Sequence, residues 1–224
     1  MRFEPRSGAR TAPSPGEALR PLTDEDRGRD DGAMTTSHGT PAHITWTRRL
    51  EEAQGLDPVA DAVEPFARKA FGTGARGAVL RGDWLGHALH PLLTDVVIGT
   101  WTSASLLDLL GGKDTGKAAQ RLTGLGLLAF GPTAWAGWAE WVDAGPREKR
   151  VGLIHVASNA VSAGVYLASW RARREGKQTQ GAMLGLAGMG VSGVGAYLGG
   201  HMAIARKVGS RNPAFDDEPS AVTF

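Results

Sequence analysis

The sequence predicts an all-α integral membrane protein whose main domain is a four-helix bundle. Apolar residues are concentrated between residues 89 and 205, whereas charged residues are concentrated before residue 80 and near the C-terminal end. The apolar region divides into four segments, each close to the about 20 residues that a helix needs to cross the hydrocarbon core. Short charged connectors that contain glycine separate the segments, as expected for turns between antiparallel helices.

The N-terminal 45 residues combine proline and dense mixed charge with few aliphatic side chains. A segment of that composition cannot bury an apolar core, so we expect a disordered arm over residues 1–45. No apolar stretch follows the early arginines, and we therefore expect no secretory signal peptide.

Residues 46–80 have the pattern of an amphipathic juxtamembrane helix. Asp57 and Pro58 suit a helix start, and Pro65 should kink the helix or end it early. Two interpretations remain open: the helix lies on the membrane surface, which we favour, or it packs on a partner helix. Its apolar positions recur at steps of three and four residues: Leu56, Val59, Val63, Phe66 and Ala70.

The membrane domain is predicted over residues 81–210 and is followed by a flexible tail at 211–224. Its four helices are expected at about 91–110, 118–142, 151–170 and 181–205.

A soluble bundle is the alternative for these segments, but they lack a charged outer face. Each glycine would also cost a soluble helix about 1 kcal/mol relative to alanine. In lipid, small residues allow close helix contact, and two pairs in the fourth segment have the required spacing, Gly181/Gly185 and Gly195/Gly199. Tryptophans near the segment ends fit an interfacial belt. These features favour helices that cross a membrane.

The orientation of the helices follows weakly from charge. Four crossings place both termini on one side, and basic residues are nearly balanced between the two sides, so the positive-inside rule does not decide. The arginines of the signal-free N-terminal arm lead us to expect both termini in the cytoplasm. A composition rich in alanine, glycine and arginine indicates a bacterial protein, so we expect the membrane to be a bacterial cell membrane.

Histidines mark the candidate site, because four of them lie in or beside the apolar segments. His87 and His90 precede the first segment, His155 lies inside the third, and His201 lies near the end of the fourth. In an up-and-down bundle, all four fall in the same half of the membrane. Ionisable groups there usually face the bundle interior or a wet cavity and pair with one another, so we predict a shared site.

Three kinds of bound group would suit that site. A b-type haem needs two axial imidazoles from different helices, one from His87 or His90 and one from His155 or His201. A non-haem metal would add a carboxylate, from Glu140 or Asp95, to two or three histidines. A proton relay or quinone pocket would use the same protonatable groups together with Asn159, which shares a helix face with His155. The competing interpretation is a structural membrane subunit without a cofactor, in which the histidines only cap helices and hydrogen-bond between them.

Composition excludes several other functions. The chain has no cysteine, which excludes disulfides, iron–sulfur ligation and cysteine nucleophiles. The net charge is only +2 and there is no basic stripe with interleaved aromatic residues, so nucleic acid is not expected as a partner. No serine–histidine–aspartate set or phosphate loop emerges, and an enzyme acting alone is the least supported class. Asp108 is expected to be a solvated residue at the membrane interface.

From about Leu50 to Pro213 the sequence resembles a bacterial membrane domain of unknown function with four predicted helices. The family is sometimes fused to, or encoded with, Rieske iron–sulfur domains, so the resemblance implies a redox role. Because this chain has no cysteine, it implies that the cluster lies on a separate Rieske-type or other electron-transfer partner. Two positions depart from the family: Ala88 replaces a proline between the first two histidines, and Glu140 replaces an aspartate. The segments that carry the resemblance are "LDPVADAVEP" (56–65), "GDWLGHALHPLLTDVVIGTWTSASLLDLLGG" (82–112), "AGWAEW" (136–141), "RVGLIHVASNAV" (150–161) and "GAYLGGHMAIARKVG" (195–209).

Overall fold

A computed structural model describes residues 40–209 of the chain. The expected disordered arm lies almost wholly outside the described residues, and the expected flexible tail at 211–224 lies entirely outside them. Within residues 40–209 every regular element is a helix, so the all-α prediction is confirmed.

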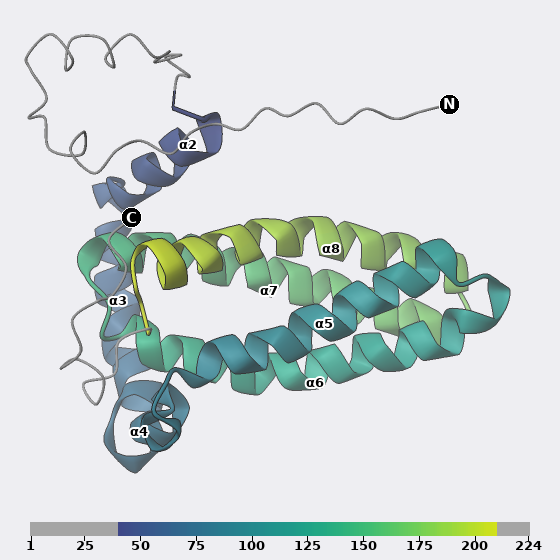
Figure 1. The fold of residues 1–224 in the computed structure, drawn as a ribbon, viewed down its shortest axis with the longest axis horizontal. Helices are drawn as coiled ribbons and strands as arrows, with labels where there is room; N and C mark the ends of the chain where they lie inside the picture. The colour runs from purple at the N-terminus through teal and green to yellow at the C-terminus, as the bar shows by residue number, and fades with distance from the viewer. Residues whose placement is uncertain (1–39, 210–224) are drawn as a thin grey trace, which may run out of the picture. The chain divides into compact units, whose positions relative to one another are not determined.

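Four long helices form the bundle, and each of the three turns between them contains glycine and at least one charged residue. Neighbouring helices run antiparallel, with α5 against α6 and α7 against α8 (Figure 1). The α6–α7 and α5–α8 contacts close the ring, so α5 and α7 face each other diagonally across its middle. The helices are α5 (Leu89–Leu110), α6 (Gly116–Trp141), α7 (Pro146–Arg174) and α8 (Gln178–Gly200), with α8 continued by a π-helical turn (His201–Ala205).

Three of the four long helices, in the part of the chain that the structure describes, are long and apolar enough to cross a membrane. These are α5, α7 and α8 with its π-helical turn. The count is one fewer than the sequence led us to expect, because α6 falls short. Its second half contains Pro132 and three tryptophans, which add less apolar character than aliphatic side chains would.

The segment before the bundle folds into short helices that pack on the end where α6 stops and α7 starts. Helix α3 ends two residues after Pro65, as expected for a helix that loses a backbone donor. Its Ala60 and Ala67 are buried against Trp141 and Val142 at the end of α6. The elements are α2 (Ala42–Glu51), α3 (Asp57–Ala67), a π-helical turn (Arg68–Gly72) and α4 (Gly74–Arg81).

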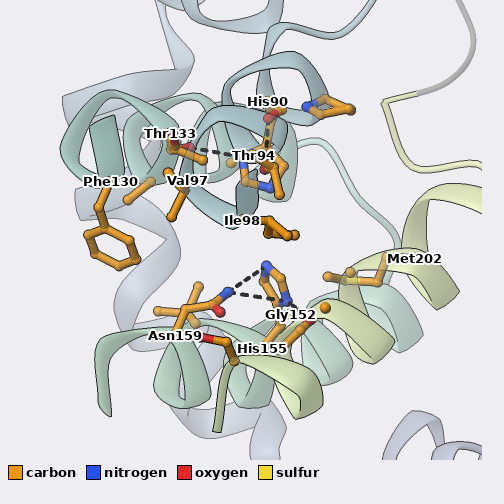
Figure 2. A pocket seen from close by; sticks show the side chains of 18 of the residues that line it. His90, Thr94, Val97, Ile98, Phe130, Thr133, Gly152, His155, Asn159 and Met202 are labelled. Atoms are coloured by element: carbon orange, nitrogen blue, oxygen red, sulfur yellow. Dashed lines mark hydrogen bonds between the residues drawn. The ribbon is translucent and has the colours of Figure 1, made fainter. Parts of the chain in front are cut away.

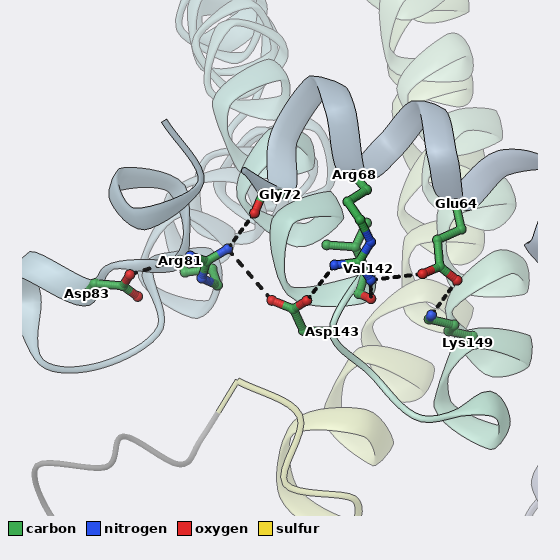
Figure 3. Close-up of polar contacts among 8 residues, drawn as sticks. All are labelled: Glu64, Arg68, Gly72, Arg81, Asp83, Val142, Asp143 and Lys149. Atoms are coloured by element: carbon green, nitrogen blue, oxygen red, sulfur yellow. Dashed lines mark hydrogen bonds and ion pairs between the residues drawn. The ribbon is translucent and has the colours of Figure 1, made fainter. Parts of the chain in front are cut away.

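Ion pairs attach the polar face of α3 to the bundle (Figure 3). Glu64 accepts a hydrogen bond of 2.5 Å from Lys149 at the start of α7, and Lys149 and Arg68 hold the pKa of the Glu64 carboxyl below its ordinary value. Arg68 reaches Asp143 in the α6–α7 turn at 3.1 Å. The opposite side of α3 leaves Phe66 exposed. Helix α3 therefore packs on helices of its own chain and keeps an outward apolar side chain.

The expectation that Asp108 is a solvated residue is wrong. Its carboxylate forms a bidentate ion pair with Arg173 of α7, and both side chains are buried. Gly181 and Gly185 of α8 lie directly against this pair, so the glycine spacing leaves room for an arginine between the helices. Gly195 likewise leaves room for a side chain between the helices, because it lies against the side chain of Asn159.

Candidate functional site

The four helices enclose a cavity of about 420 Å³. Most of its wall is apolar, which is typical of ligand sites in proteins. Polar side chains enter it from all four helices and include His90, Thr94, Glu140, His155, Asn159 and Ser192.

His90 lies in the first turn of α5 and is fixed against α6. Its Nδ1 is 2.8 Å from the carbonyl oxygen of Thr133. That carbonyl also accepts the helical N–H of Gly137, one turn further on, and its second lone pair receives the histidine. A Cβ on Gly137 would lie 2.9 Å from the His90 ring, so a larger residue would displace the imidazole.

His155 lies inside α7 and is fixed against α8 in the same way. Its Nδ1 is 2.8 Å from the carbonyl oxygen of Gly195. One turn further on, Gly199 leaves room for the ring, because a Cβ there would lie 3.0 Å from it. Both histidines thus use a backbone carbonyl and a glycine of the neighbouring helix.

The two imidazoles face each other across the cavity (Figure 2). Their ring centroids are 6.3 Å apart and their planes are nearly perpendicular, at 80°. A carbonyl oxygen can only accept, so Nδ1 carries the proton in both rings and the lone pair of each neutral ring is on Nε2. His90 and His155 therefore offer two Nε2 lone pairs from diagonal helices to one enclosed space.

Asn159, one turn after His155, lies beside that ring. Its Nδ2 is 3.0 Å from Nε2 and 3.4 Å from Nδ1 of the imidazole. A donor on the lone-pair axis of Nε2 would be far outside hydrogen-bonding distance of Nδ1. The amide therefore lies over the ring between its two nitrogens and orients the imidazole without standing in front of Nε2.

Glu140 lies at the end of α6 and lines the cavity. Its Oε1 is buried and makes no hydrogen bond to the residues that the structure describes. Asp95 is exposed on the outer face of α5 and is not part of the cavity lining. Among residues 40–209 no group of three or more histidine, aspartate or glutamate side chains could hold a metal ion. The expected set of histidines with Glu140 or Asp95 is therefore not brought together as a metal centre.

The other two candidate histidines lie outside the cavity. His87 precedes α5 and is exposed, and its ring contacts only the carbonyl of Ala88 at 3.2 Å. His201 lies in the π-helical turn after α8, where its Nε2 is 2.7 Å from Glu51. The structure thus separates the four histidines into one facing pair, one exposed residue and one partner of a carboxylate.

Glu51, the partner of His201, is a buried carboxylate outside the cavity that the sequence did not reveal. It ends α2, is almost fully buried, and binds both His201 and Arg206. Burial alone would raise the pKa of its carboxyl, but the hydrogen bonds from Arg206 and His201 outweigh that effect and keep the pKa below its ordinary value. About 150 residues separate Glu51 from these partners, so no local spacing points to them.

The family to which the chain is similar was identified by comparison with family models. The model of a family described as "Predicted membrane protein (DUF2231)" matches residues 86–212, which include the bundle and the π-helical turn after α8. No curated protein sequence and no solved structure gives a significant match to the chain.

Proposed function

The chain belongs to the DUF2231 family of predicted membrane proteins, and from that premise we propose that its bundle binds a b-type haem between His90 and His155. The observation that carries the proposal is the distance of 6.3 Å between the two ring centroids. An imidazole nitrogen binds a first-row metal at about 2 Å, so rings at this separation could both hold one iron. The measured separation therefore suits one iron held between the rings.

The hydrogen bonds of the two histidines support the same ligand. A metal-binding histidine almost always donates its other ring nitrogen to a carbonyl or carboxylate, which fixes the tautomer and the ring orientation. His90 and His155 both do so, through the carbonyls of Thr133 and Gly195.

The cavity suits a large planar group. Its volume of about 420 Å³ lies within the range of about 300–1,000 Å³ that is usual for small-molecule sites. The lining is mostly apolar, and the stacked pair Trp101 and Tyr166, 4.0 Å apart, forms part of its wall. Apolar and aromatic walls exclude water from a porphyrin and keep it in the membrane interior.

A haem with two imidazole ligands has no open coordination position and supplies one-electron transfer when bound. The residues of this chain would hold the group, fix the two imidazoles and shield it from water. We propose that electrons are exchanged with a separate electron-transfer protein, of the Rieske type or another kind, because the chain itself has no cysteine for a cluster.

We propose further that α6 crosses the bilayer together with the three candidate spans. Helix α6 packs along α5 and α7 over its length and has 26 residues, which is sufficient for a crossing. Four crossings place α2 and the end of α8 on one side, which is consistent with the Glu51–Arg206 contact. The proposed location is a bacterial cell membrane with that side in the cytoplasm.

A second candidate is a structural membrane subunit that docks a partner without a cofactor. The same two histidine hydrogen bonds favour it, because they tie α5 to α6 and α7 to α8 even when nothing is bound. The two candidates differ at Nε2 of each ring, which would bind iron in the first candidate and would bind no ligand in the second.

The test is a hemin titration of the full-length protein purified in detergent. We expect a Soret band and visible bands of a six-coordinate low-spin haem in the wild type, and their loss in the double variant His90→Ala/His155→Ala. His87→Ala is the matched control and should bind hemin as the wild type does, because His87 is exposed outside the cavity. A wild type that remains folded by circular dichroism but binds no hemin would contradict the haem proposal and leave the structural subunit.

A further inference from the structure

Three pairs of residues meet across the diagonal between α5 and α7, and the members of every pair are 65 positions apart in the sequence. One pair is the facing histidines, one is a stacked aromatic pair, and one is the buried ion pair. The pairs are His90/His155, Trp101/Tyr166 and Asp108/Arg173. A constant separation over the length of the bundle means that α5 and α7 run parallel and in register.

Helices α6 and α8 also contain equivalent residues at a constant separation, which is 62 positions. Thr133 and Gly195 supply the carbonyls that accept from the two histidines, both at 2.8 Å. The glycines that leave room for the facing side chains also correspond: Gly137/Gly199 at the histidines, and Gly126/Gly188 at Trp101 and Tyr166. The shift from 65 to 62 arises because the connection between α5 and α6 is two residues longer than that between α7 and α8, and because α5 extends one residue beyond the position equivalent to the end of α7.

Glycines without a close neighbour correspond as well. A Cβ would meet nothing within 4 Å at Gly99 and Gly164, which are 65 apart, or at Gly131 and Gly193, which are 62 apart. The positions in these pairs therefore share both the residue and its surroundings, whether those are crowded or open. Chance helix packing would not repeat this order along two separate hairpins.

We propose that the bundle consists of two copies of one helical hairpin, α5–α6 and α7–α8, related by an approximate two-fold axis that runs between His90 and His155. On such an axis each residue meets its own counterpart, as the histidine, aromatic and ion pairs do. Parallel repeats related by an axis along the membrane normal are a known architecture of membrane proteins. The site is then two equivalent half-sites, each made of a histidine, a carbonyl and a glycine.

The copies have diverged where a strict two-fold would be unfavourable. Identical hairpins would bring two aspartates, or two arginines, together at the buried position now filled by Asp108 and Arg173. Opposite charges at these equivalent positions are possible only because both copies belong to one chain. Thr94 and Asn159 are a second diverged pair, since both follow a histidine by one turn but only the amide reaches the ring.

This symmetry narrows the kind of ligand that the site can hold, and this statement about the ligand rests on the proposed haem function. A two-fold site presents the same group to both sides of whatever lies on the axis, so it suits a flat ligand with two equivalent coordinating faces. Neither histidine should dominate the binding.

The first experiment tests the duplication without any ligand, by thermal unfolding of the full-length protein in detergent. Gly137→Ala and Gly199→Ala should both lower the unfolding midpoint, and by similar amounts, because a Cβ would lie 2.9 Å and 3.0 Å from the two histidine rings. Gly131→Ala and Gly193→Ala are the matched controls in open positions and should both leave the midpoint unchanged or raised. A pair whose two members respond in opposite ways would overturn the duplication.

The second experiment compares His90→Ala with His155→Ala in the hemin titration. Equivalent half-sites predict that the two variants lose affinity by factors within about threefold of each other, a difference below about 1 kcal/mol. Both should show a five-coordinate high-spin haem that free imidazole restores to low spin. If one variant binds as the wild type does and the other loses affinity by tenfold or more, the half-sites are not equivalent. A wild type that binds no hemin defeats the haem proposal, whereas the glycine pairs still decide the duplication.

Discussion

Asp108 of α5 and Arg173 of α7 form a bidentate ion pair whose side chains are only 5% and 1% exposed. The two hydrogen bonds measure 2.9 and 2.5 Å, and Nε of the arginine also donates to Ser169. Both charges lie among apolar helices, so each depends on the other for its compensation. The pair closes the end of the bundle opposite to the α6–α7 turn and joins its two hairpins.

Asp108→Asn should therefore destabilise the bundle strongly. It leaves the Arg173 guanidinium buried without a counter-ion, and removal of one partner of a buried pair costs about 3–5 kcal/mol. The measurement is the free energy of unfolding in detergent, followed by circular dichroism. Glu175→Gln is the control, because the Glu175–Lys177 pair is more than half exposed and, screened by water, should contribute little to stability. Equal effects of the two substitutions would contradict the role given to Asp108.

Glu51→Gln should reduce stability at neutral pH and flatten its dependence on pH. The wild-type carboxyl has a pKa below its ordinary value of 4.5 because of its bonds to Arg206 and His201, despite the opposing effect of burial. A carboxyl of this kind contributes stability that is fully present above the unfolded pKa and is lost as the pH falls through the folded pKa. The expected loss in the variant is about 1–3 kcal/mol at pH 7.

Thermal unfolding between pH 3 and pH 7 checks this prediction. The wild type and Glu51→Gln should differ at pH 7 and begin to converge as the pH falls below about 4.5. They should meet only after the pH has fallen through the lower pKa of the folded carboxyl, which is then protonated as well. A difference that stays constant over the whole range would show that the charge of Glu51 does not contribute.

Much of the architecture could be predicted because hydrophobic runs and turn residues are local signals. The all-α class followed from four apolar stretches separated by charged connectors, and the start of α7 at Pro146 is of the kind that proline favours. The number of spans was harder to predict than the helical class. Proline and tryptophan make α6 less apolar than its neighbours, although it has the length of a crossing helix.

The grouping of polar residues depended on helix rotation and on distant contacts, which no local pattern records. His87 is only three residues before His90, but α5 begins at Leu89 and leaves His87 outside the helix. Asp108 appeared to be an interfacial residue because its partner lies 65 positions away on another helix. The repeat of histidine, glycine and aromatic residue in α5 and α7 was the available signal, and it becomes evident once the two helices lie in register.

Arg150→Ala should loosen the N-terminal helices while the bundle stays folded. Its guanidinium donates to both oxygens of Asp57, at 2.6 and 2.7 Å, and to the carbonyl of Glu51 at 2.7 Å. Loss of these charged hydrogen bonds should raise the population of the detached state about tenfold.

A cysteine reporter measures this detachment, because the chain has no native cysteine. Ala60→Cys lies in the buried contact between α3 and the bundle and should react slowly with a maleimide, and about tenfold faster after Arg150→Ala. Ala62→Cys is exposed on the same helix and should react equally fast in both backgrounds. Unchanged labelling of Ala60→Cys would show that Arg150 does not hold the segment.

Accessibility of three single cysteines distinguishes four crossings from three. Asp114→Cys lies between α5 and α6, Arg147→Cys lies at the start of α7, and Glu175→Cys lies after α7; all three positions are exposed. If α6 crosses the bilayer, an impermeant maleimide added to one side of sealed vesicles should label 114 and 175 together and 147 only from the other side. Labelling of 114 and 147 from the same side would show that α6 does not cross.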